Sequence, residues 1–137
     1  MRTILFILSL FMIISCDKPN DNKQQEQHND LYGSWDLKVV KGYIDMYAIY
    51  TNEIEWRFDE DSLHVSMVNG MTSPPPWLPR NNGTYSYTLH NRDSIYIFHD
   101  GQNHKYRYQI SNDTLELLYY FDNVNNYGYE YTFKKIN

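Results

Sequence analysis

The sequence predicts an all-β domain, a single eight-stranded antiparallel barrel of the up-and-down type. From Leu31 onwards apolar and polar residues alternate with a period of two, which is the pattern of half-buried strands. Turn-forming residues interrupt the alternation every dozen positions or so. Eight short antiparallel strands can form a sandwich or a closed barrel, and hairpin-like spacing without a long crossover favours the barrel.

Each predicted strand is a run of alternating residues between two turns. The runs centre on residues 35–39, 54–58, 63–67, 85–89, 95–97, 106–110, 115–117 and 129–133. Between them lie pairs such as Asn82-Gly83 and Asp100-Gly101, which tolerate the left-handed backbone of tight turns. The stretch from Tyr43 to Tyr50 fits both helical and strand spacing, and we expect a loop or a single turn of helix there.

A different pattern precedes the domain. Arg2 is followed by an apolar run from Ile4 to Ile14 and then by Ser15 and Cys16, which is the order of an export signal. A helix that spans a bilayer needs roughly 20 apolar residues, so a retained membrane helix is the weaker interpretation. Residues 13–16 resemble the bacterial lipobox, whose cysteine is acylated. We therefore expect a signal peptide over residues 1–15 and a lipid on Cys16, the chain's only cysteine.

Residues 16–30 carry the expected lipid and a polar tether. Between Asp17 and Asp30 the chain has no aliphatic or aromatic side chain to bury, so this segment should be disordered. The folded domain should cover residues 31–137. The chain is acidic, with a net charge of −5 and no basic cluster, which argues against nucleic acid as a partner. Its expected partner is a membrane, reached through Cys16, and its expected location is the outer membrane of a bacterial envelope.

The start of the first strand, Gly33-Ser34-Trp35, resembles the glycine-x-tryptophan signature of the lipocalins. With the lipobox, the polar spacer and the last strand Tyr131-Thr132-Phe133-Lys134-Lys135, the chain resembles small lipocalin-like lipoproteins of Bacteroidetes-type bacteria. The resemblance covers residues 31–136. It implies a basic residue that packs over Trp35. The candidates are Lys134 and Lys135, and we expect Lys134 to be the signature residue.

The two ends of such a barrel should differ. Connections 59–61, 90–93 and 111–113 are short and would close one end. Segments 42–52, 69–83, 100–103 and 122–128 would form a mouth at the other end, where long loops carry function. Because the tether enters at Gly33, the lipid should attach at the closed end and the mouth should point away from the membrane.

Large aromatic rings should fill most of the interior. An eight-stranded barrel is just wide enough for side chains or for one small ligand. The predicted inward set is Trp35, Trp56, Phe58, Tyr85, Tyr87, Tyr106, Tyr108, Tyr129, Tyr131 and Phe133. This leaves room for a small tyrosine-lined pocket near the mouth. Its candidate residues are Tyr43, Tyr47, Trp56, Met71, Trp77, Tyr87, Tyr106, Tyr108 and Tyr127.

The run from Ser73 to Pro79 holds four prolines and favours extended polyproline II. Two interpretations stay open. The run is either a recognition loop, or a rigid lid whose Trp77 folds back over the barrel.

The chain contains no catalytic motif that we recognise, and no cofactor is indicated, so we do not expect an enzyme. His99 and His104 flank a predicted hairpin at the mouth. Two histidines supply too few ligands for a metal site, and we expect two polar residues at a solvated turn.

Two functional hypotheses follow. The first is a monomeric, lipid-anchored barrel that binds a small molecule or glycan fragment at its mouth. The second is an inhibitor-type or immunity-type lipoprotein that contacts a protein through the proline-rich loop 69–83.

Overall fold

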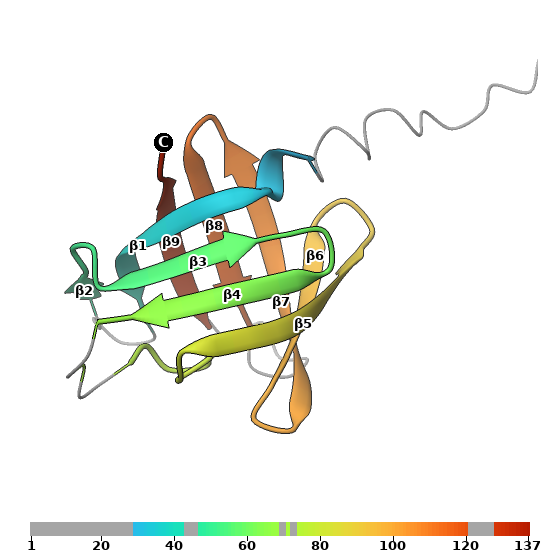
Figure 1. Ribbon diagram of the computed structural model, residues 1–137, viewed down its shortest axis with the longest axis horizontal. Helices are drawn as coiled ribbons and strands as arrows, with labels where there is room; N and C mark the ends of the chain where they lie inside the picture. The colour runs from blue at the N-terminus through green and yellow to red at the C-terminus, as the bar shows by residue number, and fades with distance from the viewer. Residues whose placement is uncertain (1–28, 43–46, 69–70, 72–73, 121–127) are drawn as a thin grey trace, which may run out of the picture.

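The computed structural model describes residues 29–42, 47–68, 71, 74–120 and 128–137. The predicted signal peptide, Cys16, Tyr43 and Tyr127 lie outside these residues. Nine strands form the described part of the fold (Figure 1): β1 (Gly33–Lys41), β2 (Tyr47–Ile49), β3 (Ile54–Phe58), β4 (Ser62–Met67), β5 (Gly83–His90), β6 (Ser94–His99), β7 (Gln102–Ser111), β8 (Thr114–Tyr119) and β9 (Tyr129–Lys135).

Eight of these strands close into the predicted barrel. From β3 to β9 each strand pairs antiparallel with the next one along the chain, and β1 pairs with both β3 and β9. The β1–β9 pairing removes the free edges that an open sheet would leave. The turns also follow the prediction, since Asn91, Asp100 and Asn112 all adopt positive φ angles.

The ninth strand, β2, corrects the expectation of a loop or helical turn over residues 43–50 for residues 47–49; residues 43–46 lie outside the described ranges. Tyr47, Ala48 and Ile49 pair with the second half of β1, opposite Lys41, Val40 and Val39. The physical reason is the length of β1. β3 covers only Gly33 to Asp36 on that side, so the backbone groups further along β1 are left for β2.

The interior is filled by the predicted rings. In β3 the pattern of buried and exposed residues alternates perfectly, so that Ile54, Trp56 and Phe58 point inward. Of the predicted inward rings, only Tyr85 and Tyr129 are partly exposed. Trp56 packs against both Phe58 and Phe133 in the middle of the barrel. The interior of the described barrel is therefore packed with side chains, whereas a barrel that carries a large ligand has a deep cavity.

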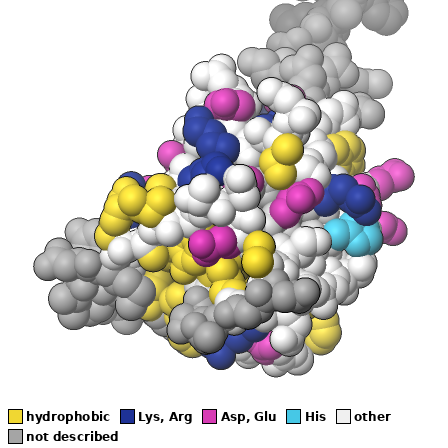
Figure 2. All heavy atoms as spheres, turned by 60° about the vertical axis from the view of Figure 1, so that its left-hand side comes forward, with side chains coloured by type: hydrophobic (Ala, Val, Ile, Leu, Met, Phe, Trp, Pro, Cys, Tyr) yellow, Lys and Arg dark blue, Asp and Glu magenta, His cyan; other side chains and the backbone are white. Residues whose placement is uncertain are grey.

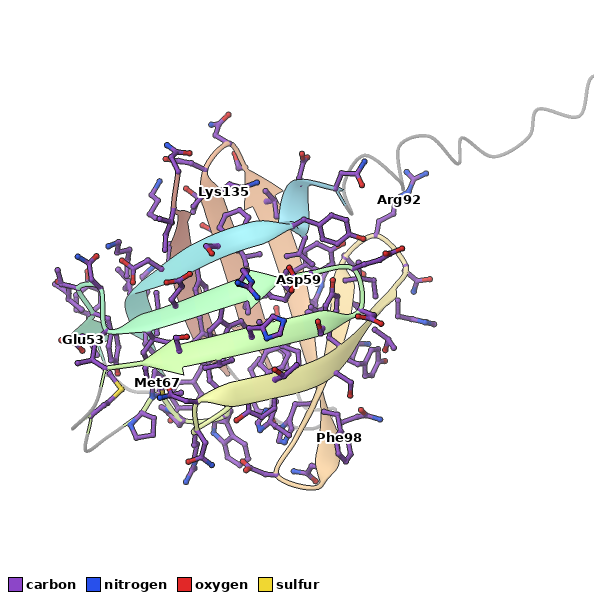
Figure 3. All side chains as sticks on the ribbon, in the orientation of Figure 1. Glu53, Asp59, Met67, Arg92, Phe98 and Lys135 are labelled. Atoms are coloured by element: carbon purple, nitrogen blue, oxygen red, sulfur yellow. The ribbon has the colours of Figure 1, made fainter. Side chains whose placement is uncertain are left out.

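The closed end is built around Trp35. A helical turn over residues 29–31 covers this end, so Asn29 and Asp30 belong to the fold although they were assigned to the tether. The indole N–H of Trp35 donates to the carbonyl of Leu31 at 2.7 Å. Figure 3 shows Arg92 and Lys135 at this end and Glu53, Met67 and Phe98 toward the other. Within the described ranges no helix has the length and apolar character needed to cross a membrane.

The basic residue over Trp35 is Lys135, which corrects the choice of Lys134. The ammonium of Lys135 lies 5.1 Å from the centre of the indole ring and donates to the carbonyl of Asp30. Lys134 instead contacts Asp113 and Thr114 on the outer wall. Successive residues of a strand point to opposite faces, so only one of the two lysines can meet the tryptophan.

Candidate functional site

The mouth of the barrel is covered by part of the proline-rich loop. We call residues 74–79 the cap. Its residue Leu78 is almost fully buried, with 1% of its surface exposed, and Pro75 and Pro79 are also buried. Trp77 is half-buried and has a φ of +61°, a backbone conformation that is rare for a bulky residue.

Two tyrosines from the barrel wall hold the cap by its backbone. The hydroxyl of Tyr131 on β9 donates to the carbonyl of Pro76 at 2.6 Å, and the hydroxyl of Tyr106 on β7 donates to the carbonyl of Trp77. The indole of Trp77 stacks on Tyr119 of β8, with ring centres 5.3 Å apart. Of the two interpretations of the proline-rich run, the rigid lid with Trp77 folded back over the barrel describes these residues.

Beneath the cap lies a buried pair of histidines. His99 ends β6 and His104 lies on β7, and their rings stack with centres 3.8 Å apart. Only 3% and 4% of their surfaces are exposed, so the expectation of solvated turn residues is wrong. The cap and the neighbouring strands exclude the water that a hairpin end normally meets. The described residues contain no group of three or more side chains that could hold a metal ion.

Burial dominates the electrostatics of this cluster. It lowers the pKa of His99, and the neighbouring His104 lowers it further, while the carboxylate of Asp100 acts in the opposite direction. Burial also lowers the pKa of His104. Burial raises the pKa of the phenols Tyr106 and Tyr131 well above its ordinary value. All four side chains are therefore neutral at pH 7.

A separate pocket of about 240 Å³ opens on the rim of the mouth, between the ends of β1, β8 and β9. We call it the rim pocket. Its lining residues are Lys41, Gly42, Leu118, Tyr119, Tyr120, Gly128, Tyr129 and Glu130. Lys41 and Glu130 form an ion pair with an N–O distance of 2.7 Å. A Cβ on Gly128 would lie 1.2 Å from the carbonyl oxygen of Tyr119, so glycine is required there.

One residue of the rim pocket contacts the cap. Tyr119 lines the pocket and also carries the stacked indole of Trp77. A movement of the cap would therefore remove a neighbour from one wall of the pocket.

Several predicted site residues lie elsewhere. The hydroxyl of Tyr87 donates to the carbonyl of Asp59 at the closed end, and the backbone N–H of Tyr108 donates to the carbonyl of Asp93 at the same end. Neither belongs to the mouth. Trp56 is a core residue, Met71 packs partly buried against the core, and Tyr47 lies on β2 with 60% of its surface exposed.

Of the residues that line the rim pocket, Gly42 and Gly128 fall in the predicted mouth segments 42–52 and 122–128, but none was a candidate site residue. Lys41 and Glu130 are direct partners in the register between β1 and β9. Each of the two lies at the mouth end of its strand, and opposite charges at paired strand ends are a signal that could have pointed to them.

The architecture places this domain in the lipocalin-like class of barrels. It resembles the crystal structure of a lipocalin-like protein from Bacteroides uniformis, with a TM-score of 0.53, 16% identity and coverage of 78% of this chain and 99% of that one. A protein of unknown function from Bacteroides eggerthii matches with the same TM-score and identity, over 77% of this chain and 99% of that one. At this identity the likeness concerns the fold. No family model and no curated protein matches the chain.

Proposed function

We propose that the protein is a lipid-anchored binding protein of the bacterial cell envelope and that it takes a small molecule or glycan fragment in the rim pocket. One observation carries the proposal: three tyrosines line this pocket beside the Lys41–Glu130 ion pair. A lipocalin-like barrel suits ligand binding in general, and because side chains fill the interior of the described barrel, the rim pocket offers a site outside that core.

The chemistry of the rim pocket suits a compact, polar ligand with one apolar face. Tyrosine rings offer flat apolar surface together with a hydroxyl. Lys41 supplies N–H donors and Glu130 supplies carboxylate acceptors. The volume of about 240 Å³ lies just below the usual range of ligand pockets, which begins near ~300 Å³. A single sugar-sized ring fits this description better than an extended lipid.

The anchoring part of the proposal rests on the leader and Cys16. The described chain begins at Asn29, in the helical turn at the closed end, on the side away from the cap (Figure 1). A lipid on Cys16 would therefore hold the closed end nearer the membrane. Intact-mass measurement of the natively expressed protein should show an acylated mature chain that begins at Cys16, and an unacylated chain that keeps residues 1–15 would reject the anchor.

Ligand-observed NMR with a set of mono- and disaccharides tests the binding site. We expect at least one sugar to show saturation transfer from the wild-type protein and to lose it with Glu130→Gln or Tyr120→Ala. The matched control is Glu60→Gln, an exposed glutamate in the turn between β3 and β4 at the closed end, which should leave the signal unchanged. Equal signals from all variants, or none from the wild-type protein, would reject the rim pocket as a glycan site.

One observation favours a protein partner as the second candidate. Large apolar side chains are exposed at the mouth end, and Figure 2 shows hydrophobic surface gathered there. They are Tyr47, Ile49, Val68, Phe98 and Tyr120, with 47% to 69% of their surfaces exposed. Exposed apolar patches often mark interaction sites. Native mass spectrometry of protein taken from its own envelope separates the candidates, because a retained small mass supports the ligand and a retained second chain supports the protein partner.

A further inference from the structure

We propose that the cap is a pH-responsive lid: protonation of the stacked His99–His104 pair releases residues 74–79 from the barrel mouth. This regulation rests on the proposed function only for its purpose, which is to change the surroundings of the rim pocket. Its mechanism stands on contacts within the described chain and can be tested without a ligand.

A chain of hydrogen bonds connects the histidine pair to the cap. Tyr106 has one hydroxyl hydrogen, which it donates to the carbonyl of Trp77. The Nε2 atom of His99 lies 3.0 Å from the same hydroxyl oxygen and must therefore donate its own N–H to it. With the cap closed, this contact fixes the neutral tautomer of His99 that carries its hydrogen on Nε2.

His104 has no means of accommodating a second proton while the cap is closed. Among the described residues its Nε2 atom is buried and has no hydrogen-bond partner. A proton there would create an N–H donor without an acceptor. It would also place a positive charge in the ring that stacks on His99, at a centre-to-centre distance of 3.8 Å. Buried unpaired charges are strongly unfavourable, and entry of water on lifting the cap relieves both problems.

The charged groups around the pair decide the direction of the effect. Asp100, in the turn after β6, approaches Nδ1 of His99 to 3.2 Å and favours its cation, but 56% of the Asp100 side chain is exposed and water screens the attraction. Arg80, which follows the cap, disfavours that cation. The other near neighbours of the histidine pair are Tyr106, Tyr119 and Trp77, and these are uncharged at neutral pH.

The sign of the linkage follows from these neighbours. Burial holds the pKa of both histidines below the ordinary value of 6.5 when the cap is closed, so the closed form binds fewer protons than the open form. Closure is then most stable above pH 6.5. It weakens as the pH falls through 6.5 toward the lowered pKa values.

The backbone of the cap favours release as well. Trp77 is held at a φ of +61°, and a bulky residue in this region carries strain that surrounding contacts must offset. When the bond from Tyr106 is lost, Trp77 can relax and leave Tyr119. Tyr119 also lines the rim pocket, so release of the cap changes one of its walls.

Acrylamide quenching of tryptophan fluorescence measures the opening directly in the folded chain. Trp35 and Trp56 are fully buried in the core, so a rise in quenching reports Trp77. We expect the quenching of the wild-type protein to rise reversibly between about pH 8 and about pH 5, the range in which histidines titrate. Circular dichroism should show an intact barrel throughout.

The double variant His99→Gln, His104→Gln keeps amide hydrogen-bonding groups but cannot titrate, and its quenching should be independent of pH. His90→Gln changes an exposed histidine at the closed end and should keep the wild-type transition. Should the double variant not fold, Tyr106→Phe cuts the connection to Trp77 and should make quenching high already at neutral pH. A flat wild-type profile, or a transition that survives in the double variant, would overturn the proposal.

Discussion

The closed end and the mouth of this barrel are sealed in different ways. At the closed end Trp35 is held by groups next to it in the fold, the carbonyl of Leu31 and the ammonium of Lys135, which sits on the neighbouring strand β9. At the mouth the seal is a loop segment that is bound through its backbone carbonyls by tyrosines 29 and 55 residues further along the chain. The closed end is therefore closed by contacts of the barrel strands, whereas the mouth is covered by the cap, which is a loop segment outside the sheet.

This difference concerns stability and access together. Removing part of the closed end disturbs strands that must pair for the barrel to exist. Removing a contact of the cap leaves all the described strand pairs in place. Local opening of a protein draws on such low-stability segments, so the mouth is the end at which access can change while the barrel remains folded.

The largest predicted effect is at the closed end. Replacing Trp35 by alanine should lower the free energy of unfolding by about 3–5 kcal/mol, because a fully buried indole is lost from the core. Urea denaturation measures this. Trp77→Ala should cost clearly less, since its ring is only half-buried. Equal losses would mean that the two ends are not different.

Leu78→Ala should have the next largest effect. Its side chain is part of the cap and is buried, and truncation of a buried leucine costs about 2 kcal/mol or more. We expect the low end of that range, because the cap can lift instead of leaving a cavity. Acrylamide quenching at neutral pH should rise along with the loss of stability. A full loss without increased quenching would show that the cap is part of the rigid core.

Tyr131→Phe tests the hydrogen bond that holds the cap at Pro76. The variant leaves a partly buried carbonyl without its donor, and the expected cost is about 1–2 kcal/mol. The measurement is again urea denaturation. Tyr96→Phe, on a half-exposed ring of β6, is the matched control and should cost less. No difference between the two would remove Tyr131 from the account of the cap.

A smaller loss of stability is expected from replacing the lysine that packs over Trp35. Lys135→Met should cost about 0.5–1 kcal/mol, from the lost cation–π contact with Trp35. Lys134→Met removes an exposed ion pair with Asp113 and should stay within about 0.5 kcal/mol of the wild-type protein. Thermal denaturation of both variants would compare them. A larger loss for Lys134→Met would restore it as the signature residue.

The smallest predicted effect is a change in the pH profile of the cap. Asp100→Asn removes the carboxylate that raises the pKa of His99, and asparagine tolerates the positive φ at this turn. The pKa of His99 in the closed form should fall further, so acidification should open the cap more completely. Quenching at about pH 5 should exceed the wild-type value. Lower quenching would mean that Asp100 opposes closure.

The sequence predicts the strands because their signal is local. Residues such as Ile54, Trp56 and Phe58 alternate with charged residues, and one buried face requires that alternation. Trp35 and the closed end can be predicted equally well, because the glycine-x-tryptophan signature and the short turns lie within single strands and hairpins. β2 escaped prediction because three residues are too few to show a period.

The mouth could be predicted only in part. The alternation of residues along a strand shows which ring points inward, but it does not show where that ring lies along the barrel axis. Tyr87 and Tyr108 were therefore predicted at the wrong end. Counting from the hairpin at Asp100-Gly101 would have put Tyr108 in the far half of β7. The burial of His99 and His104 depends on a cap contributed by another loop, and no pattern near the histidines indicates it.

Hydrogen exchange followed by mass spectrometry tests the contrast between the two ends most directly. Protection factors, corrected for the intrinsic effect of pH, should be compared for residues 77–82 and for residues 33–37 at about pH 8 and about pH 5. Protection near the cap should fall at the lower pH, while protection at the start of β1 should be unchanged. Equal protection of both segments at both pH values, or a loss confined to β1, would contradict this contrast.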